Sequence, residues 1–304
     1  YQCDWSSDVC SSDLDWHMLS MPHSMKQPIP SPRQIADFRR VVWEHYRQNG
    51  REMPWREDPS PYKVLVSELM LQQTQVVRVL PKFEAFMYTC PDFASLAKKN
   101  LGEVLALWSG LGYNRRAKFL HQTAHLVVSD YDGSLPDVRE ELVRLPGIGK
   151  NTAGAILAYA YNQPVIFIET NIRTVYFHHF YADSTDLVSD KELESLVELT
   201  LDREHPREWY WALMDYGTYL KKAAGGRLTS SKHYIKQPPL KGSVREMRGR
   251  ILKVLVTGPK VEKELREKVE ADERFEPALC SLLQEGLIEQ NGQNICLTGS
   301  SQTS

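Results

Sequence analysis

Residues 145–153 read LPGIGKNTA, and this stretch decides the fold. Two glycines follow a proline, and the next residues open an apolar helix that continues through 155–157, where the sequence reads AIL. Glycines permit backbone conformations that aim amide N–H groups outward, and the N-terminus of a helix attracts anions such as phosphate. Lys150 adds a positive charge beside those amides. The stretch therefore predicts a phosphate-binding glycine hairpin; the alternative is an ordinary Pro-Gly turn between two core helices.

The segments on both sides of this hairpin have the periodicity of short helices. Apolar residues recur at the spacing of one helix face near the start of the chain: Ile35, Phe38, Val42 and Tyr46. Glycines and prolines divide residues 53–181 into short helical stretches, and another helix is expected at about 191–222. The fold predicted for residues 25–224 is therefore mainly α.

The composition limits the class of protein. The 304 residues are enough for two compact domains. Because the formal net charge is −2, a nucleic-acid partner would have to meet a local basic surface. No apolar run approaches the ~20 residues that cross a bilayer, no secretion signal is recognisable, and the five cysteines show no CxxC spacing. We expect a cytoplasmic protein without a membrane span, a disulfide framework or a metal site.

The first residues carry a different signal. Residues 4–14 read DWSSDVCSSDL, which resembles a translated sequencing adapter. We exclude residues 1–24 from the fold and expect a disordered tail. The alternative to an adapter is a flexible tail that genuinely belongs to the protein. Met18, Met21 and Met25 are candidate starts.

The C-terminal third changes character at a basic segment. Lysines and arginines between residues 221 and 253 are opposed only by Glu246, and this segment contains Gly225-Gly226 and Pro238-Pro239. We expect residues 225–242 to form a basic linker to a second domain. Three helical stretches follow, and then Asn291-Gly292 lies between two short extended runs, which predicts a tight hairpin. Residues 243–304 therefore resemble a small winged helix.

Three further motifs precede the glycine hairpin. Residues 54–56 read PWR, residues 62–76 read YKVLVSELMLQQTQV, and residues 110–113 read GLGY. In this order the motifs resemble the A/G-specific adenine DNA glycosylases of the helix-hairpin-helix DNA glycosylase superfamily, over about residues 53–217. The resemblance implies a domain of two helical lobes. It also implies an enzyme that flips a base out of double-stranded DNA and hydrolyses its N-glycosidic bond.

The resemblance assigns the chemistry to two acidic residues. Glu68 matches the acid that protonates adenine and handles the water nucleophile, and its apolar neighbours should desolvate it and raise its pKa. Glu169 stands where the family has an aspartate that stabilises positive charge developing on the sugar. Such a charge pair is worth about 4 kcal/mol at ~4 Å, or roughly a thousandfold in rate. An extra methylene displaces the carboxylate by about an ångström, so the alternative for Glu169 is a helix N-terminal residue in a weakened or repurposed enzyme.

The resemblance also assigns contacts with the flipped nucleotide. Gln72, Gln73 and Tyr113 match residues that wedge into the duplex and fill the gap that flipping leaves. Arg56 and Asp215 match residues that bond the edge of the flipped base.

The hairpin distinguishes two kinds of chemistry. Its expected DNA contacts come from five residues: Gly147, Gly149, Lys150, Asn151 and Thr152. Endonuclease III-type relatives place a Schiff-base lysine directly after the residue that matches Lys150, and they cut the strand. This chain has Asn151 there, whose amide cannot attack a sugar, so a monofunctional glycosylase is expected. The resemblance also allows a structural monovalent cation at the hairpin.

This chain departs from the family after Gly217. The family usually has four cysteines there that hold a [4Fe–4S] cluster, whereas this chain has no cysteine between Cys90 and Cys280. We therefore expect no cluster and no other cofactor. The basic loop around Lys232 would bind phosphate in place of the cluster loop.

A second departure is the C-terminal domain. The family usually ends in a β-rich domain that resembles Nudix hydrolases and recognises 8-oxoguanine, and a small winged helix replaces it here. Because its third helix is acidic, we expect it either to bind a protein partner or to contact DNA through its first helix. The basic residues of that helix are Arg245, Arg248 and Arg250.

The sequence thus predicts a base-excision repair DNA glycosylase that removes adenine mispaired with guanine or 8-oxoguanine. One alternative is an endonuclease III-like glycosylase and lyase that acts on another mispaired or damaged base. Another is a catalytically idle protein that binds DNA structure. The expected partner is double-stranded DNA with a mispair or a damaged base, and the expected state is a monomer at a prokaryotic nucleoid.

Overall fold

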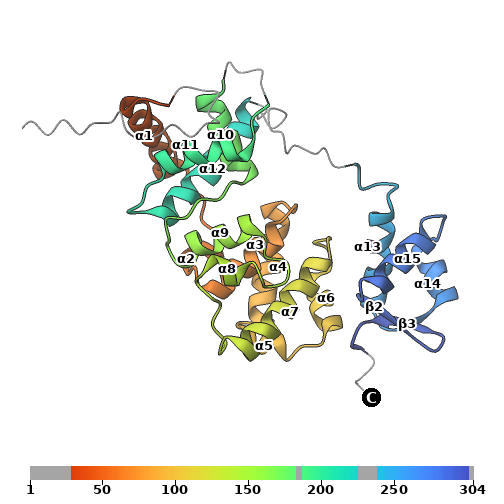
Figure 1. Ribbon diagram of the computed structural model, residues 1–304. Helices are drawn as coiled ribbons and strands as arrows, with labels where there is room; N and C mark the ends of the chain where they lie inside the picture. Colours follow the sequence, from red (N-terminus) through yellow and green to blue (C-terminus); the bar gives the residue numbers. More distant parts are fainter. Residues whose placement is uncertain (1–28, 183–186, 225–237, 301–304) are drawn as a thin grey trace, which may run out of the picture.

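The computed structural model describes residues 29–182, 187–224 and 238–300. The predicted tail at 1–24, most of the predicted linker at 225–242 and the candidate phosphate ligand Lys232 lie outside the described residues. The described chain forms two helical lobes and a C-terminal unit, residues 243–300 (Figure 1). In this part of the chain no helix is both long and apolar enough to cross a membrane.

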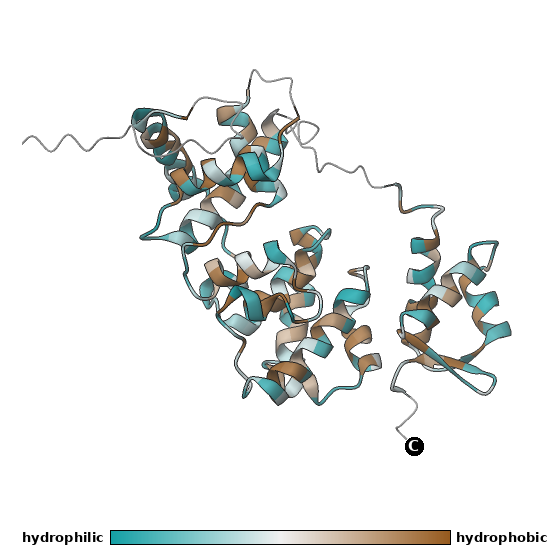
Figure 2. Cartoon of the chain, viewed as in Figure 1, coloured by the Kyte–Doolittle hydropathy of each residue, from teal (hydrophilic) through white to brown (hydrophobic). Residues whose placement is uncertain are grey.

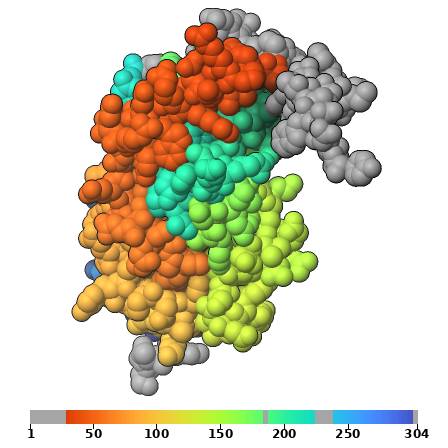
Figure 3. Space-filling view, turned by 90° about the vertical axis from the view of Figure 1, so that its left-hand side faces the viewer, coloured from red at the N-terminus to blue at the C-terminus, as the bar shows by residue number. Residues whose placement is uncertain are grey.

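One lobe combines the first helix with the helices that follow the glycine hairpin. It contains α1 (Pro32–Asn49), α10 (Thr170–Phe180), α11 (Asp190–Thr200) and α12 (Pro206–Ala224). Helix α1 begins at Ser31 because the Ser31 hydroxyl accepts from the backbone N–H of Gln34 and Pro32 fixes the first turn. Helix α12 packs between α1 and α10, and Figure 3 shows α12 (teal) against α1 (red to orange) on one face.

The other lobe holds the motifs that precede the hairpin, and the hairpin itself. Its helices are α2 (Pro54–Glu57), α3 (Pro61–Leu71), α4 (Val76–Thr89), α5 (Phe93–Ala97), α6 (Leu101–Trp108), α7 (Arg115–Asp130), α8 (Arg139–Leu142) and α9 (Lys150–Tyr159). Helix α3 begins where the Ser60 hydroxyl accepts from the backbone N–H of Lys63. Helices α3 and α12 both pack against α9, which joins the two lobes.

The C-terminal unit has the topology of a winged helix. Its elements are α13 (Val244–Leu255), β1 (Lys260–Val261), α14 (Glu262–Val269), α15 (Phe275–Gln284), β2 (Ile288–Asn291) and β3 (Asn294–Leu297). The antiparallel sheet has the order β1-β3-β2, and Asn291 pairs with Asn294 across the expected hairpin. The sequence pattern did not indicate β1, because two residues are too few for a periodicity.

The predicted fold class, mainly α with a small C-terminal domain, is confirmed. Hydrophobic (brown) and hydrophilic (teal) residues lie on different sides of most helices in Figure 2. The C-terminal unit contacts the second lobe at α6 and α7: the backbone N–H of Gly102 donates to the carbonyl of Thr298 over 2.9 Å, and Lys118 donates to the carbonyl of Glu285.

Candidate active site between the helical lobes

A cavity of about 1320 Å³ lies where the two lobes meet. It exceeds the ~300–1,000 Å³ usual for small-molecule pockets, and we call it the catalytic cavity. Both candidate acids line it, and they come from different helices. Its charged and polar lining includes Arg56, Glu68, Gln72, Gln73, Asn151, Tyr159, Glu169, Asn171, Arg173 and Lys221.

Glu68 is the acid on α3. Its chain neighbours Leu69 and Met70 are completely buried, and the Glu68 side chain is half-buried at the cavity. Burial raises the pKa of Glu68 well above its ordinary value; the nearby Glu169 raises it further, and Arg56 lowers it. The environment therefore favours a protonated carboxyl that can donate its proton near neutral pH.

Glu169 is the second acid and caps the N-terminus of α10. Its backbone is extended, with φ −110°, and its side chain accepts no capping hydrogen bond from the helix. Burial raises the pKa of the Glu169 carboxyl, while the charges of Lys221 and Arg173 lower it. Because one carboxylate disfavours the other, the pair shares its protons unequally, and Lys221 and Arg173 favour the ionised form of Glu169.

Of the two residues expected to bond the flipped base, Arg56 lines the cavity and Asp215 does not. The Arg56 guanidinium lines the cavity and donates to both oxygens of Asp215, each over 2.9 Å. Arg51 donates to the same carboxylate from its backbone N–H over 2.8 Å and from Nε over 2.7 Å. Asp215 is only 3% exposed and is absent from the cavity wall, so its carboxylate holds two arginines and does not face a base.

The three candidate wedge residues lie at the border between two cavities. Gln72 and Gln73 line the catalytic cavity and also a second cavity, of about 1280 Å³, between the second lobe and the C-terminal unit. Tyr113 lines the second cavity. Gln73 and Tyr113 have φ of +57° and +47°, left-handed conformations that cost non-glycine residues energy. Such strain often accompanies functional positions.

The glycine hairpin leads into α9 as expected. Gly147 has a φ of +77°, whereas Gly149 is extended and a Cβ atom there would meet nothing within 4 Å. No side chain caps the N-terminus of α9 in the described structure, and Lys150 is exposed beside it. The first amides of α9 thus have the geometry of an anion site.

Asn151 and Thr152 face the interior of the site more than the outside of the hairpin. The Asn151 amide donates to the carbonyl of Ile168 over 2.9 Å, directly before Glu169. The Thr152 hydroxyl accepts from the amide of Gln72 over 3.4 Å. These hydrogen bonds link the first turn of α9 to the segment before Glu169 and to Gln72.

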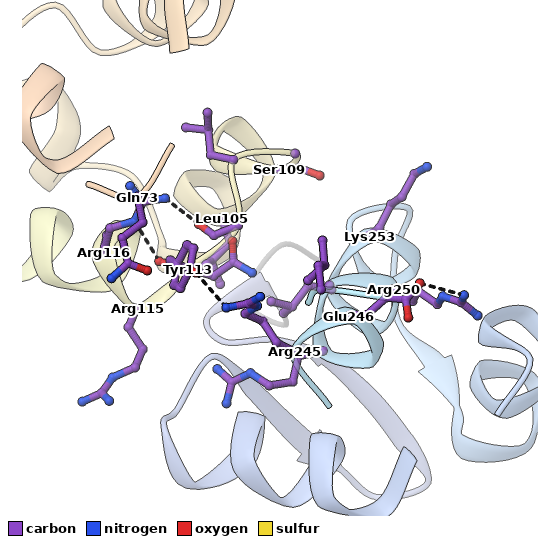
Figure 4. A pocket seen from close by; sticks show the side chains of 18 of the residues that line it. Gln73, Leu105, Ser109, Tyr113, Arg115, Arg116, Arg245, Glu246, Arg250 and Lys253 are labelled. Carbon is purple, nitrogen blue, oxygen red and sulfur yellow. Dashed lines mark hydrogen bonds and ion pairs between the residues drawn. The ribbon is translucent and has the colours of Figure 1, made fainter. Parts of the chain in front are cut away.

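The basic residues of α13 are largely engaged within the protein. Arg248 pairs with Glu285 over 2.6 Å and donates to the hydroxyl of Ser281, so the structure does not present it as a DNA contact. Figure 4 shows Arg245 directed across the second cavity to Tyr113, where Nη1 donates to the phenol oxygen over 2.8 Å. Arg250 pairs with Glu246. The arginines of α13 therefore form ion pairs and hydrogen bonds within the protein. The sequence pattern could not indicate these long-range partners.

Comparisons with known proteins identify the family. A model described as HhH-GPD superfamily base excision DNA repair protein matches residues 66–199. An adenine DNA glycosylase of Mycobacterium tuberculosis is 35% identical over 77% of this chain and 83% of the relative. One of Mycolicibacterium smegmatis is 32% identical over 88% of this chain and 98% of the relative. The chain belongs to the adenine DNA glycosylase family.

The predicted resemblance is thereby confirmed, and this adenine DNA glycosylase family member is a base-excision repair glycosylase, a hydrolase of N-glycosidic bonds. Solved structures show the same fold. A thermostable thymine-DNA glycosylase superposes with a TM-score of 0.56 at 22% identity, covering 66% of this chain and 93% of that one. An endonuclease III bound non-covalently to DNA gives a TM-score of 0.56 at 20% identity, covering 67% and 94%.

The cysteines of this adenine DNA glycosylase family member do not fit a [4Fe–4S] cluster. Cys90 and Cys296 are buried in different parts of the structure, and Cys280 is exposed on α15. Iron–sulfur clusters need four thiolates together, and the sequence between Cys90 and Cys280 has none. Within residues 29–182, 187–224 and 238–300, no three His, Cys, Asp or Glu side chains are grouped to hold a metal ion.

Sequence reasoning missed two cations of this family member's site, Lys221 and Arg173. Both line the catalytic cavity and lower the pKa of Glu169. The available signal was the position of Lys221 on α12, one helical turn after Gly217, but its meaning depends on the packing of α12 against α10.

Proposed function

We propose that this protein is a monofunctional glycosylase that removes adenine paired with guanine or 8-oxoguanine in double-stranded DNA. The main support is the convergence of Glu68 and Glu169 on one cavity, at the border where Gln72 and Gln73 would enter the duplex. The adenine assignment rests on the names of two bacterial relatives and one mouse relative, each an adenine DNA glycosylase. The mouse relative is 34% identical over 70% of this chain and 45% of its own length.

The two acids have complementary tasks in the proposed reaction. The Glu68 carboxylic acid donates its proton to a ring nitrogen of the flipped adenine, and the bond between that base and C1′ of the sugar breaks with its electron pair going to the base. The Glu169 carboxylate stabilises the cation that develops on the sugar. A water molecule then attacks C1′, and the Glu68 carboxylate takes the water proton. Adenine and an abasic site are the products.

The proposal excludes strand cleavage through the hairpin. Asn151 stands where a lyase would have its amine, and its amide is hydrogen-bonded to the carbonyl of Ile168. We further propose that the protein works without an iron–sulfur cluster, as a monomer on DNA at a prokaryotic nucleoid. The exposed N-terminus of α9 beside Lys150 supports the phosphate contact that this requires.

The test is an excision assay on duplexes with every base opposite adenine and with damaged bases. We expect abasic sites opposite guanine and 8-oxoguanine with the unchanged protein and far fewer with Glu68→Gln. Glu169→Asp should lose on the order of a hundredfold, because its carboxylate moves by about an ångström. A borohydride-trapped covalent adduct would favour the endonuclease III-like alternative. DNA binding without excision of any base would favour the idle DNA-binding alternative.

A further inference from the structure

Lys221 is a half-buried cation within the catalytic cavity that the reaction described above does not use. Its Nζ donates to Oδ1 of Asn171 over 2.6 Å, and both residues line the cavity with Glu169. Asn171 is two residues after Glu169 on the first turn of α10. Lys221 is therefore held beside the acid that the sugar cation requires, from a different helix.

The packing of α12 explains why Lys221 reaches this place. Gly217 lies one helical turn before Lys221, and a Cβ atom at Gly217 would lie 2.4 Å from the carbonyl oxygen of Asn171. Only glycine allows the backbone of α12 to come this close to the start of α10. The close approach places the next turn of α12, which carries Lys221, beside the N-terminus of α10.

The other charged groups that line the cavity are acids, cations paired with a carboxylate, or the exposed Lys222. Arg173, on α10, holds both oxygens of Asp190 over 2.7 and 2.6 Å. Arg56, on α2, holds Asp215. Glu68 on α3 and Tyr159 on α9 face the same cavity and carry no positive charge. Of the two cations that lower the pKa of Glu169, Arg173 is paired with a carboxylate, whereas Lys221 donates to a neutral amide.

We propose that Lys221 is a positioning residue for Glu169: it orients the longer carboxylate toward the sugar and keeps it ionised while the base leaves. This inference rests on the proposed function, because it concerns the same reaction. Glutamate in place of the shorter aspartate needs such a restraint, since an unrestrained extra methylene allows several carboxylate positions. Lys221 and Glu169 would act as one unit.

The proposal fixes the sign of a pH effect. Glu169 must be deprotonated to stabilise the sugar cation, and Lys221 lowers the pKa of Glu169. Removal of Lys221 therefore raises the pKa of Glu169, and the acidic limb of the excision rate moves to higher pH. Each unit of that movement corresponds to about tenfold in rate on the acidic limb.

The experiment compares Lys221→Met and Lys221→Arg with Lys98→Met, which removes an exposed charge outside the catalytic cavity. Single-turnover excision is measured from pH 5 to 9, after circular dichroism has shown that each variant is folded. We expect Lys221→Met to move the acidic limb to higher pH and to lose at least about tenfold in rate at the acidic end. Lys221→Arg should restore most of the limb, and Lys98→Met should leave its position unmoved. A uniform loss at all pH values, or no loss, overturns the proposal.

A second measurement tests the role of Lys221 independently of the proposed glycosylase function. Carbon-13 NMR of labelled glutamate carboxyls follows the titration of Glu169 without any DNA, with Glu169→Gln used for assignment. A higher pKa for Glu169 in Lys221→Met supports the positioning role, and an unchanged pKa overturns it. If the unchanged protein excises no base, the proposed function fails, whereas this titration still decides the electrostatic link between Lys221 and Glu169.

Discussion

Two carboxyl groups with different surroundings form the chemical centre at the scale of single residues. Glu68 lies among completely buried apolar neighbours on α3, whereas Glu169 lies between two cations. Pairs of acids whose environments separate their pKa values can divide proton donation from charge stabilisation. The asymmetry comes from the neighbours, since both residues are glutamates.

Replacement of Glu68 by glutamine tests the proton donor. The amide keeps the size of the side chain but cannot donate a carboxyl proton, so excision should fall by at least about 10²–10⁴-fold. Affinity for a duplex that contains a stable abasic-site analogue should stay within about threefold, because the wedge and hairpin are untouched. Single-turnover excision and fluorescence anisotropy measure the two quantities. Equal losses in both would mean that Glu68 supports binding and not chemistry.

The lowered pKa of Asp215 predicts that the free energy of unfolding depends on pH. Burial alone raises the pKa of the Asp215 carboxyl, but hydrogen bonds and charges from Arg56 and Arg51 hold it below its ordinary value. A carboxyl with a lowered folded pKa contributes stability that is complete above the unfolded pKa of about 3.9 and is lost as the pH falls through the lower folded value. Urea unfolding at pH 7 and pH 3 should show this loss.

The variant Asp215→Asn serves as the comparison. It leaves Arg56 without its charged partner in a buried place, which should cost about 3–5 kcal/mol of unfolding free energy at pH 7. As the pH falls below the lowered folded pKa of Asp215, the difference from the unchanged protein should shrink, because Asp215 is then protonated in both folded and unfolded chains. A difference that is constant with pH would show that the ion pairs are not its source.

At the scale of single elements, the hairpin before α9 uses its two glycines for different reasons. Gly147 needs its left-handed conformation, and a Cβ atom there would lie 2.8 Å from Cβ of Phe119. Gly149 has neither a left-handed backbone nor a steric conflict, because its backbone is extended and the space around it is open. That open space is where a phosphate would approach the amides of α9.

The two glycines therefore give a matched pair of variants. Gly147→Ala should lower the unfolding free energy by at least about 1–2 kcal/mol, because of the left-handed backbone alone. Gly149→Ala should leave stability within about 0.5 kcal/mol and weaken duplex binding roughly tenfold, equivalent to one lost charge-assisted hydrogen bond of about 1.5 kcal/mol. Thermal unfolding and anisotropy distinguish the two. The reverse pattern would contradict a phosphate contact at Gly149.

Arg116 on α7 joins the elements that carry the wedge. Its guanidinium donates to the carbonyls of Leu69 and Gln72, each over 2.6 Å, and to that of Gly112 over 2.8 Å. It thereby satisfies the C-terminus of α3 and the turn before α7 with one rigid fork. Burial lowers its pKa to about 10, which leaves it charged at neutral pH.

Replacement of Arg116 by lysine should therefore affect stability and excision together. Lysine cannot reproduce the planar fork, so at least one buried carbonyl loses its donor, at a cost of about 1–3 kcal/mol. Because Gln73 and Tyr113 then lose their common support, the excision rate should also fall. Urea unfolding and single-turnover excision measure both effects, with Arg33→Lys at an exposed position of α1 as the control. Unchanged excision in a destabilised variant would show that the wedge does not depend on Arg116.

At the scale of the whole molecule, the sequence predicted what local patterns determine. The helices, the glycine hairpin and the β2–β3 turn follow from periodicity and turn chemistry, and the family motifs identified Glu68. The engaged state of Arg248, the buried position of Asp215 and the reach of Lys221 depend on residues far away in the chain. Long-range ion pairs leave no periodicity, so the sequence could not indicate them. The roles of the individual site residues stay predictions.

The docking of the C-terminal unit decides how DNA reaches Tyr113. Arg245 of α13 lies over the Tyr113 ring, 5.3 Å from its centroid, so a duplex must displace this contact before the ring can insert. The remaining side-chain links across this interface include Lys118 to the carbonyl of Glu285 and Arg115 to its carboxylate over 3.9 Å. Exposed links of this kind contribute about 0.2–1 kcal/mol each. We therefore expect the unit to move when DNA binds.

A double variant, Arg115→Ala with Lys118→Ala, tests this mobility. Loss of roughly 1–2 kcal/mol from the interface should increase the undocked population about 5–30-fold. Small-angle X-ray scattering should then give a larger radius of gyration for the free protein, while a bound duplex brings the double variant and the unchanged protein to the same value. Lys98→Ala, an exposed charge at the end of α5, is the control. An unchanged free-state profile would mean that backbone contacts such as Gly102 to Thr298 hold the unit, and that DNA enters without its displacement.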